Sequence, residues 1–411
     1  MRYLPLLRRG ICGIGSASAS QKALRPAPKP FERRRLAPHR LALGASVSAV
    51  ALFLAAACFV SVASALPIGC VKVRGPKGGS RVQCPKVSYK FHTLNDNADF
   101  TFNQLLGINQ SGVIAGYFGS GLQGHPNKGY LLFPPYVQNY YADNNFPGSV
   151  QTQVTGLNNN GVLVGFYSTM NNPSVNGAPP VNDNHAWYKV NGHFFPADFP
   201  TQGQFTPANP PVDQLLGVNN KGVAVGFFTD SQGNNHGYTY DIARSMFRLV
   251  TVPRFTNITA AAINDARDIA GFGTINGSTE GFLLANGKTT EIKVPGSSST
   301  QALGINNNDE VVGFYTVGSG SSAVMHGFSW YPGYRFHTIN APGGTNTTTI
   351  NGVNGCGDIV GFYVDGAGNT DGLLGNARYS TYVSPVSGAA PDASTAAVTS
   401  KKIKAKLPKG C

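Results

Sequence analysis

Apolar and polar positions alternate over short stretches along most of the chain, and one such pattern recurs six times. It consists of an apolar pair, an Asn, a polar turn, a run of β-branched residues, a Gly and an aromatic residue. The copies start at Gly107, Gly156, Gly217, Ala262, Gly304 and Gly352, at intervals of 49, 61, 45, 42 and 48 residues. A fixed pattern with variable gaps indicates one structural unit repeated, with insertions in its loops.

Two positions are the same in every copy. The Asn stands at Asn109, Asn158, Asn219, Asn264, Asn306 and Asn354. The Gly follows seven residues later, at Gly116, Gly165, Gly226, Gly271, Gly313 and Gly361. Asn favours a turn at its position. A fixed Gly inside the next strand predicts a bulge or the close approach of another backbone.

Each unit is predicted to hold four short strands. The first ends just before the Asn, the second is rich in β-branched residues, the third is short and aromatic, and the fourth is like residues 334–343. Outside the N-terminal segment no stretch shows a sustained 3.6-residue apolar period. Four strands in 42–61 residues match the period of a propeller blade. We therefore predict an all-β protein, a β-propeller of six four-stranded blades, over residues 90–383.

The chain also offers a way to close the ring. Residues 89–96 (YKFHTLND) resemble the fourth strand at 334–340 (YRFHTIN) and precede the first unit. They could therefore supply the outer strand of the last blade, although residues 378–383 compete for the same place. Closing the ring protects sheet edges from pairing with other chains.

The His-Ala/Gly-aromatic step of the third strand, together with G-I-N-x-x-G-x-V-V-G-[FY], resembles the HAF-type repeats of bacterial extracellular proteins. The resemblance covers about residues 90–375. Three units replace the His, with Lys128, Glu280 and Asp371. The resemblance implies an exported β-propeller-like protein and implies no particular reaction, since fold does not give function.

The N-terminal segment has the pattern of a secretory signal. An Arg-rich stretch at 33–40 precedes 25 uncharged residues at 41–65, which end in Ala63-Ser64-Ala65. A positive region, an apolar region and a small-residue cleavage site describe a signal peptide. We expect residues 1–65 to be removed and the protein to be secreted or held in the cell envelope. If the leader is retained, the same apolar run would form an N-terminal membrane anchor.

Charge is distributed unevenly. The whole chain has a net charge of +13, but residues 91–383 carry a net charge of −6 and residues 66–90 carry +6. A nucleic-acid face needs Lys and Arg clustered on the folded body, so nucleic acid is not expected as a partner. The basic neck (66–89) and the flexible basic tail (384–411) could touch anionic envelope polymers or membranes, although solvated linkers are the interpretation we favour.

Four cysteines follow the leader, an even number that suits an exported chain. Cys70 and Cys84 flank a stretch with Gly-Pro and Gly-Gly turns, which favours a local disulfide. Cys356 and Cys411 would then tie the tail back to the body. Four cysteines allow three connectivities, and sequence does not choose among them.

Catalytic and metal-binding patterns are missing from the sequence. It contains no P-loop, G-x-S-x-G, H-E-x-x-H or C-x-x-C pattern. His185, His236 and His326 share one repeat position, but third strands of separate blades lie too far apart to ligate one ion. We expect them to pack and form hydrogen bonds beside aromatic residues. No cofactor, metal or enzymatic activity is expected.

Two long insertions interrupt the repeats, at Ser168–Asn184 and at about Ala197–Asp213. Loops after the second and fourth strands emerge on the same face of a propeller, so the insertions should lie side by side. Loops on a rigid scaffold often carry function. The predicted binding residues are in or beside these insertions: Asp183, His185, Trp187, Phe199 and Phe205.

We therefore expect an exported, non-catalytic binding or surface-interaction module that acts as a monomer. Its expected partner is an extracellular glycan or protein, and glycans are the first ligands to test. The alternative is a secreted propeller hydrolase or lyase that acts on polysaccharide. An Asp pair converging on a His of the insertion-bearing face would favour that alternative. A third hypothesis is a surface coat that self-associates.

Overall fold

The computed structural model describes residues 70–74, 80–84, 86–122, 124–170, 182–201, 203–380, 382–384, 401–403 and 411. The predicted leader, residues 1–65, lies outside them. In these ranges the chain is all-β, apart from the short 3-10 helix η1 (Gly320–Ser322). No helix in the described ranges is long and apolar enough to cross a membrane.

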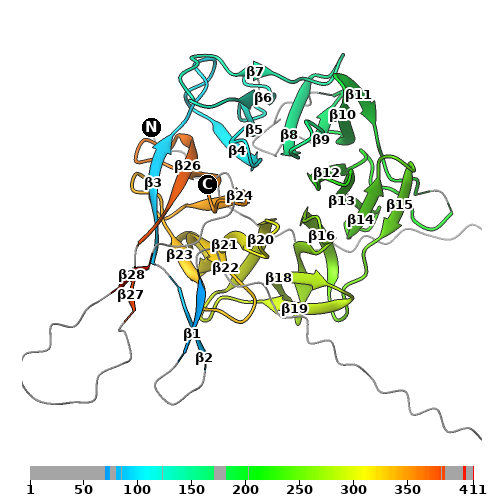
Figure 1. Cartoon of the computed structure of the whole chain (residues 1–411). Coiled ribbons are helices and arrows are strands. Elements are labelled where there is room, and N and C mark those ends of the chain that lie inside the picture. The colour runs from blue at the N-terminus through cyan, green and yellow to red at the C-terminus, as the bar shows by residue number, and fades with distance from the viewer. Residues whose placement is uncertain are drawn as a thin grey trace, which may run out of the picture. The chain divides into compact units, whose positions relative to one another are not determined.

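Six four-stranded antiparallel sheets stand around a common axis as the blades of a β-propeller (Figure 1), as predicted. The first blade consists of β4 (Asn103–Ile108), β5 (Ile114–Phe118), β6 (Lys128–Leu132) and β7 (Ala142–Asp143). The second consists of β8 (Gln151–Leu157), β9 (Leu163–Ser168), β10 (His185–Val190) and β11 (His193–Pro196). The third consists of β12 (Asp213–Val218), β13 (Val223–Thr229), β14 (Asn235–Asp241) and β15 (Met246–Leu249).

The remaining blades follow the same order from the axis outward. The fourth consists of β16 (Thr256–Ile263), β17 (Ile269–Ile275), β18 (Ser278–Ala285) and β19 (Lys288–Ile292). The fifth consists of β20 (Ser299–Ile305), β21 (Val311–Val317), β22 (Val324–Trp330) and β23 (His337–Ile339). The sixth consists of β24 (Thr349–Val353), β25 (Ile359–Val364), β26 (Thr370–Tyr379) and, from the start of the chain, β3 (Val87–Thr93).

The N-terminal candidate closes the ring. β3 pairs with β26 over its whole length, from Thr93 opposite Leu373 to Val87 opposite Tyr379. The competing stretch at 378–383 is divided instead. Its first residues continue β26, and β27 (Tyr382–Ser384) pairs with β28 (Lys401–Ile403) of the tail. Because β26 runs on to Tyr379, that stretch cannot fold back as the outer strand of the same blade.

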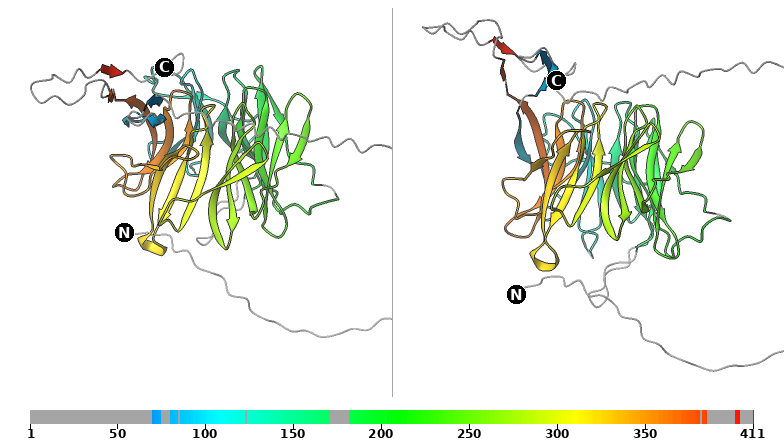
Figure 2. Two further views of the ribbon diagram at one scale, coloured as in Figure 1. Left: turned by 60° about the horizontal axis from the view of Figure 1, so that its bottom comes forward. Right: turned by 90° about the horizontal axis from the view of Figure 1, so that it is seen from below.

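Both favoured disulfides are present. Cys70–Cys84 closes the hairpin of β1 (Val71–Arg74) and β2 (Ser80–Gln83), and Cys356 pairs with Cys411. The hairpin β1–β2 and the pair β27–β28 lie at the opposite end of the propeller from η1 (Figure 2). We call the end that carries the turns begun by the six fixed Asn the turn face. The other end, with the loops after the second and fourth strands, is the insertion face.

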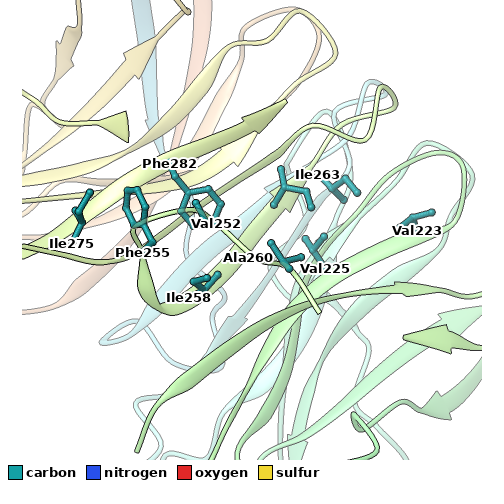
Figure 3. Close-up of a cluster of buried hydrophobic side chains, with 11 residues drawn as sticks. Val223, Val225, Val252, Phe255, Ile258, Ala260, Ile263, Ile275 and Phe282 are labelled. Carbon is teal, nitrogen blue, oxygen red and sulfur yellow. The ribbon is translucent and has the colours of Figure 1, made fainter. Parts of the chain in front are cut away.

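Apolar side chains of adjacent blades meet and form the core between them. Between the third and fourth blades, Val223 and Val225 of β13 pack with Ile258 and Ala260 of β16 and with Phe282 of β18 (Figure 3). Phe282 has no exposed surface, and burying a side chain of that size contributes roughly 1.5–3 kcal/mol. Similar clusters join the other blades, so each blade is held by both of its neighbours.

The fixed Gly of each second strand lies opposite a bulge in the first strand. The register shifts at this place in all six blades. A Cβ at Gly313 would stand 1.9 Å from the carbonyl oxygen of Gln301, and at the other five glycines the gap would be 1.9–2.2 Å. Both predicted causes, the bulge and the close backbone, are therefore confirmed.

The fixed Asn has a role beyond its own turn. Its Oδ1 accepts backbone hydrogen bonds locally, as from the N–H of Val162 to Asn158 (3.0 Å), and its Nδ2 reaches the next blade. The Nδ2 donates to the backbone carbonyl of the next fixed Asn in five blades: Asn109 to Asn158, Asn158 to Asn219, Asn219 to Asn264, Asn306 to Asn354 and Asn354 to Asn109. Asn264 donates to Asp309 Oδ1 instead (3.2 Å). These amides circle the end of the central channel on the turn face and link the blades.

Candidate functional site

The two insertions meet on the insertion face beside the second and third blades. Asn184, at the end of the first, forms a parallel bridge with Val212 of the second. Its backbone N–H donates to the carbonyl of Pro211 (2.8 Å), and its carbonyl accepts from the N–H of Asp213 (2.9 Å). The predicted proximity is confirmed for the ends of the insertions, since residues 171–181 lie outside the described ranges.

His185 lies between carboxylates from the two insertions. Its Nδ1 is 2.6 Å from Asp198 Oδ2, and its Nε2 is 3.3 Å from Asp183 Oδ2. The hydrogen bond with Asp198 raises the pKa of His185 despite partial burial. Both ring nitrogens therefore face carboxylates, and the imidazole links the two insertions.

Asp183 is buried and holds the start of its insertion. It accepts hydrogen bonds from the backbone N–H groups of Thr169 (3.0 Å) and Met170 (3.0 Å) and from the Thr169 hydroxyl. Burial opposes ionisation of this carboxyl, but these hydrogen bonds outweigh burial and lower its pKa. Asp183 therefore anchors the loop while it faces His185.

The three predicted aromatic residues lie in or against the core. Trp187 is fully buried and packs on Phe194 with ring centroids 5.1 Å apart, so it has no surface to offer a ligand. Phe199 is half-buried, 4.6 Å from Phe228. Phe205 is also half-buried and packs on His236, with ring centroids 4.3 Å apart. Phe199 and Phe205 thus pin the second insertion to the third blade.

A buried acid lies beneath the second insertion. Asp213 Oδ1 accepts from the hydroxyl of Tyr238 (2.5 Å) and Oδ2 from the backbone N–H of Phe199 (2.6 Å). Burial nevertheless raises the pKa of Asp213 to about 7, because desolvation outweighs these hydrogen bonds. The junction between the second and third blades therefore changes its charge near neutral pH.

An open cleft of about 450 Å³ lies where the insertions meet the inner strands. Its lining is dominated by amide side chains: Asn127, Gln151, Gln153, Asn182, Asn184 and Gln214. Thr152, Phe166, Ser168 and Val212 complete it. No charged residue is among them, so the cleft is polar and neutral.

Some amide groups of the cleft pair with each other and leave others available. Gln153 Nε2 donates to Asn127 Oδ1 (3.1 Å), and Gln214 Nε2 donates to Asn184 Oδ1 (3.0 Å). Among the described residues, the Oε1 atoms of Gln153 and Gln214 accept no hydrogen bond. Gln151 Oε1 accepts from the backbone N–H of Asn127 (3.3 Å), while its buried Nε2 has no partner in the described structure. An amide buried without a partner costs stability.

Sequence reasoning missed these glutamines. Gln104, Gln153, Gln214 and Gln301 occupy one repeat position, opposite the aromatic residue after the fixed Gly. A polar residue repeated inside apolar strands was the available signal. The pattern did not show that Gln153 and Gln214 line one cleft with the described ends of the insertions.

The repeated histidines have the predicted packing role. His236 Nε2 lies 2.8 Å from Asp230 Oδ2, and its ring stacks on Phe228. His326 Nδ1 lies 2.8 Å from Asn340 Oδ1, beside Tyr315. Among the residues that the structure describes, no three His, Cys, Asp or Glu side chains are grouped as a metal ion requires.

Comparisons with known proteins bear on the fold alone. No protein-family model and no curated protein matches the chain, so the resemblance to HAF-type repeats stays a prediction. A protein of unknown function from Dyadobacter fermentans matches with a TM-score of 0.50 and 10% identity, over 72% of this chain and 100% of its own.

Two further solved structures match with lower TM-scores. An arginine triple mutant of AofleA from Arthrobotrys oligospora has a TM-score of 0.40 and 10% identity, over 72% of this chain and 87% of its own. An ulvan lyase of polysaccharide lyase family 25 has a TM-score of 0.37 and 11% identity, over 76% of this chain and 92% of its own. These likenesses carry no argument about function.

Proposed function

We propose that the protein is an exported, non-catalytic binding module that holds a neutral glycan in the amide cleft of the insertion face. The observation that carries the proposal is the convergence of six amide side chains in a single cleft beside Phe166, two of them glutamines whose Oε1 atoms accept no hydrogen bond among the described residues. Amides supply both donors and acceptors, which is what sugar hydroxyl groups need.

The shape and charge of the cleft agree with this ligand class. Binding pockets combine apolar walls with a few convergent polar groups, and here Phe166 and Val212 stand beside the amides. The lack of charge in the lining favours a neutral saccharide over an acidic one. The insertions are held by Asp183, His185 and Asp198, so the cleft is organised before a ligand arrives.

The cellular location is part of the same proposal. The two disulfides suit an oxidising compartment outside the cytosol. We propose that the segment 1–65 directs export, and that the repeats belong with those of HAF-type extracellular proteins. The protein would act as a monomer on an extracellular glycan.

The test is binding of the full chain to an array of neutral oligosaccharides, followed by titration calorimetry with the best ligand. Gln153→Ala together with Gln214→Ala should raise Kd at least tenfold. The matched control is Gln301→Ala, at the same repeat position in the fifth blade, and should change Kd less than twofold. Equal losses in both variants, or no neutral ligand on the array, would overturn the proposal.

A second variant tests the role of the insertion. Replacing residues 171–181 by a short Gly-Ser turn leaves Asp183 and its hydrogen bonds to Thr169 and Met170 in place. If the insertion contributes to the site, the shortened protein should keep its unfolding temperature and lose affinity. Unchanged affinity would limit the site to the inner strands.

A second candidate function is a polysaccharide hydrolase or lyase, favoured by the convergence of Asp183 and Asp198 on His185. Both ring nitrogens of His185 face carboxylates, so neither is directed at a substrate, and we rank this function below binding. Release of new reducing ends or unsaturated sugars by the full chain, abolished in His185→Gln, would establish it. Absence of product while the glycan binds would favour the binding module.

A further inference from the structure

A second pocket, of about 430 Å³, lies on the turn face where the fifth and sixth blades meet. The closing strand β3 contributes Tyr89, and the loop after β22 contributes Tyr331 and Arg335. Cys70 and Cys84 of the neck also line the pocket. It therefore forms where the neck, which is not part of the repeats, meets the propeller.

A buried carboxyl group organises the polar side of this pocket. Glu310 is 4% exposed, and its Oε1 accepts from the Ser329 hydroxyl (2.6 Å). Its Oε2 accepts from the Tyr331 hydroxyl (2.8 Å) and from Asn306 Nδ2 (3.2 Å). Burial raises the pKa of Glu310. Its role is positional, because it holds two hydroxyl groups at the pocket wall.

Aromatic rings also line this pocket. Tyr89, Tyr334 and Tyr379 line the pocket and are half-buried. The ring of Tyr89 lies nearly parallel to that of His337, with centroids 6.0 Å apart and an interplanar angle of 16°. Flat aromatic faces next to hydroxyl groups suit the apolar face and the hydroxyl edge of a pyranose ring.

The exposed charge at this pocket is positive. Lys86 and Arg335 line it, are exposed, and form no ion pair among the described residues. Burial and the nearby Lys86 lower the pKa of His337, so that side chain is neutral at pH 7. Besides Lys86, the neck (residues 66–89) holds four basic and no acidic residues in sequence. A positive field of this kind attracts an anionic ligand.

We propose that this pocket binds a carboxylated saccharide, with the sugar ring on the tyrosines and its carboxylate on Lys86 and Arg335. The hydroxyl groups held by Glu310 favour a polyhydroxylated ligand over a simple acidic peptide. The site differs from the neutral amide cleft in face, charge and lining, so neither depends on the other. A protein with both would contact a neutral and an acidic glycan on opposite faces.

The experiment titrates the full chain with hexagalacturonate, cellohexaose and polyglutamate at physiological ionic strength. Hexagalacturonate should bind, and the double variant Lys86→Gln with Arg335→Gln should raise its Kd at least tenfold. The charge-matched control, Arg248→Gln with Lys288→Gln, removes two exposed cations from β15 and β19 and should change Kd less than twofold. Equal losses in the two double variants would overturn the proposal, because they would mean attraction to bulk charge.

A second pair of variants tests the stacking. Tyr334→Ala should raise the Kd for hexagalacturonate at least fivefold, while Tyr140→Ala, at a tyrosine that is 69% exposed in the first blade, should leave it unchanged. Competition by polyglutamate as strong as that by hexagalacturonate would overturn the saccharide assignment. Binding of cellohexaose lost in Gln153→Ala with Gln214→Ala, but kept in the Lys86 and Arg335 variant, would separate the two sites.

Discussion

The junction between the second and third blades and the junction between the fifth and sixth use the same scaffold for different chemistry. Each holds a buried acid whose pKa burial raises, Asp213 in the first and Glu310 in the second, and each acid accepts a tyrosine hydroxyl. The first junction opens into a neutral cleft of amides, and the second into a pocket with aromatic rings and cations.

The difference comes from segments outside the repeats. The described ends of the two insertions line the amide cleft, and the neck with its disulfide adjoins the charged pocket. The repeats fix where blades meet, because the Asn ring and the bulge glycines leave little freedom. A repeated scaffold therefore gains distinct surfaces where non-repeated sequence is added to a junction.

The largest expected effect is loss of the folded propeller, and with it of both binding sites. Gly313→Ala would place a Cβ 1.9 Å from the Gln301 carbonyl oxygen, and overpacking of rigid backbone should cost about 3 kcal/mol or more. We expect loss of the cooperative unfolding transition in circular dichroism and of binding at both sites. Gly366→Ala, where a Cβ meets nothing within 4 Å and the backbone is not in the left-handed region, is the milder comparison.

The second-largest effect on stability should come from the ring of fixed Asn side chains on the turn face. Asn158→Ala removes a buried side chain that bonds its own turn and the carbonyl of Asn219, and should lower the free energy of unfolding by about 2 kcal/mol. Urea denaturation measures this loss in the free energy of unfolding. Asn160→Ala, which removes only an exposed bond to Asn220, should cost much less. Equal costs would show that the ring contributes no more than a surface bond.

The pH dependence distinguishes the two buried acids. The pKa of Asp213 is raised to about 7, so its protonated form favours the folded state and stability falls as pH rises through 7. Between pH 6 and 8 the loss should be about 1.4 kcal/mol, and Asp213→Asn should remove it. Thermal unfolding at pH 6 and 8 tests this.

Glu310 should also make the folded state less stable as pH rises, because burial raises the pKa of this carboxyl as well. Glu310→Gln should therefore also remove part of the stability loss that accompanies rising pH. His185, whose pKa is raised by Asp198, likewise loses its stabilising charge as pH rises through that pKa. A parent protein whose stability increases from pH 6 to 8 would contradict the assignment for Asp213.

The smallest effect should be confined to one site. Cys70→Ser with Cys84→Ser opens the β1–β2 hairpin beside the charged pocket. We expect about a threefold rise in the Kd for hexagalacturonate, roughly 0.6 kcal/mol at RT ≈ 0.59 kcal/mol. The unfolding temperature and the affinity for a neutral glycan should stay the same. A change in neutral binding would mean that the two junctions are coupled.

Much of the fold was open to prediction because it repeats. The fixed Asn and Gly, seen six times, predicted the turns, the bulges and the number of blades, and the spacing of Cys70 and Cys84 favoured their disulfide. The candidate sites were less accessible. Asp183 and His185 were identified as insertion residues, but the cleft glutamines and Glu310 stand at ordinary repeat positions, where sequence gives no sign of a pocket.

The sequence by itself determined the strand pattern, the blade count and the points where insertions enter, because these follow from local periodicity and turn chemistry. Tertiary structure decided which strand closes the ring, that the Asn amides reach the next blade, and that Trp187 is buried. It also brought Gln153 and Gln214 into one cleft, and Lys86 and Arg335 into one pocket. Such pairs join blades or chain ends far apart in sequence, so only packing of the whole ring sets their proximity.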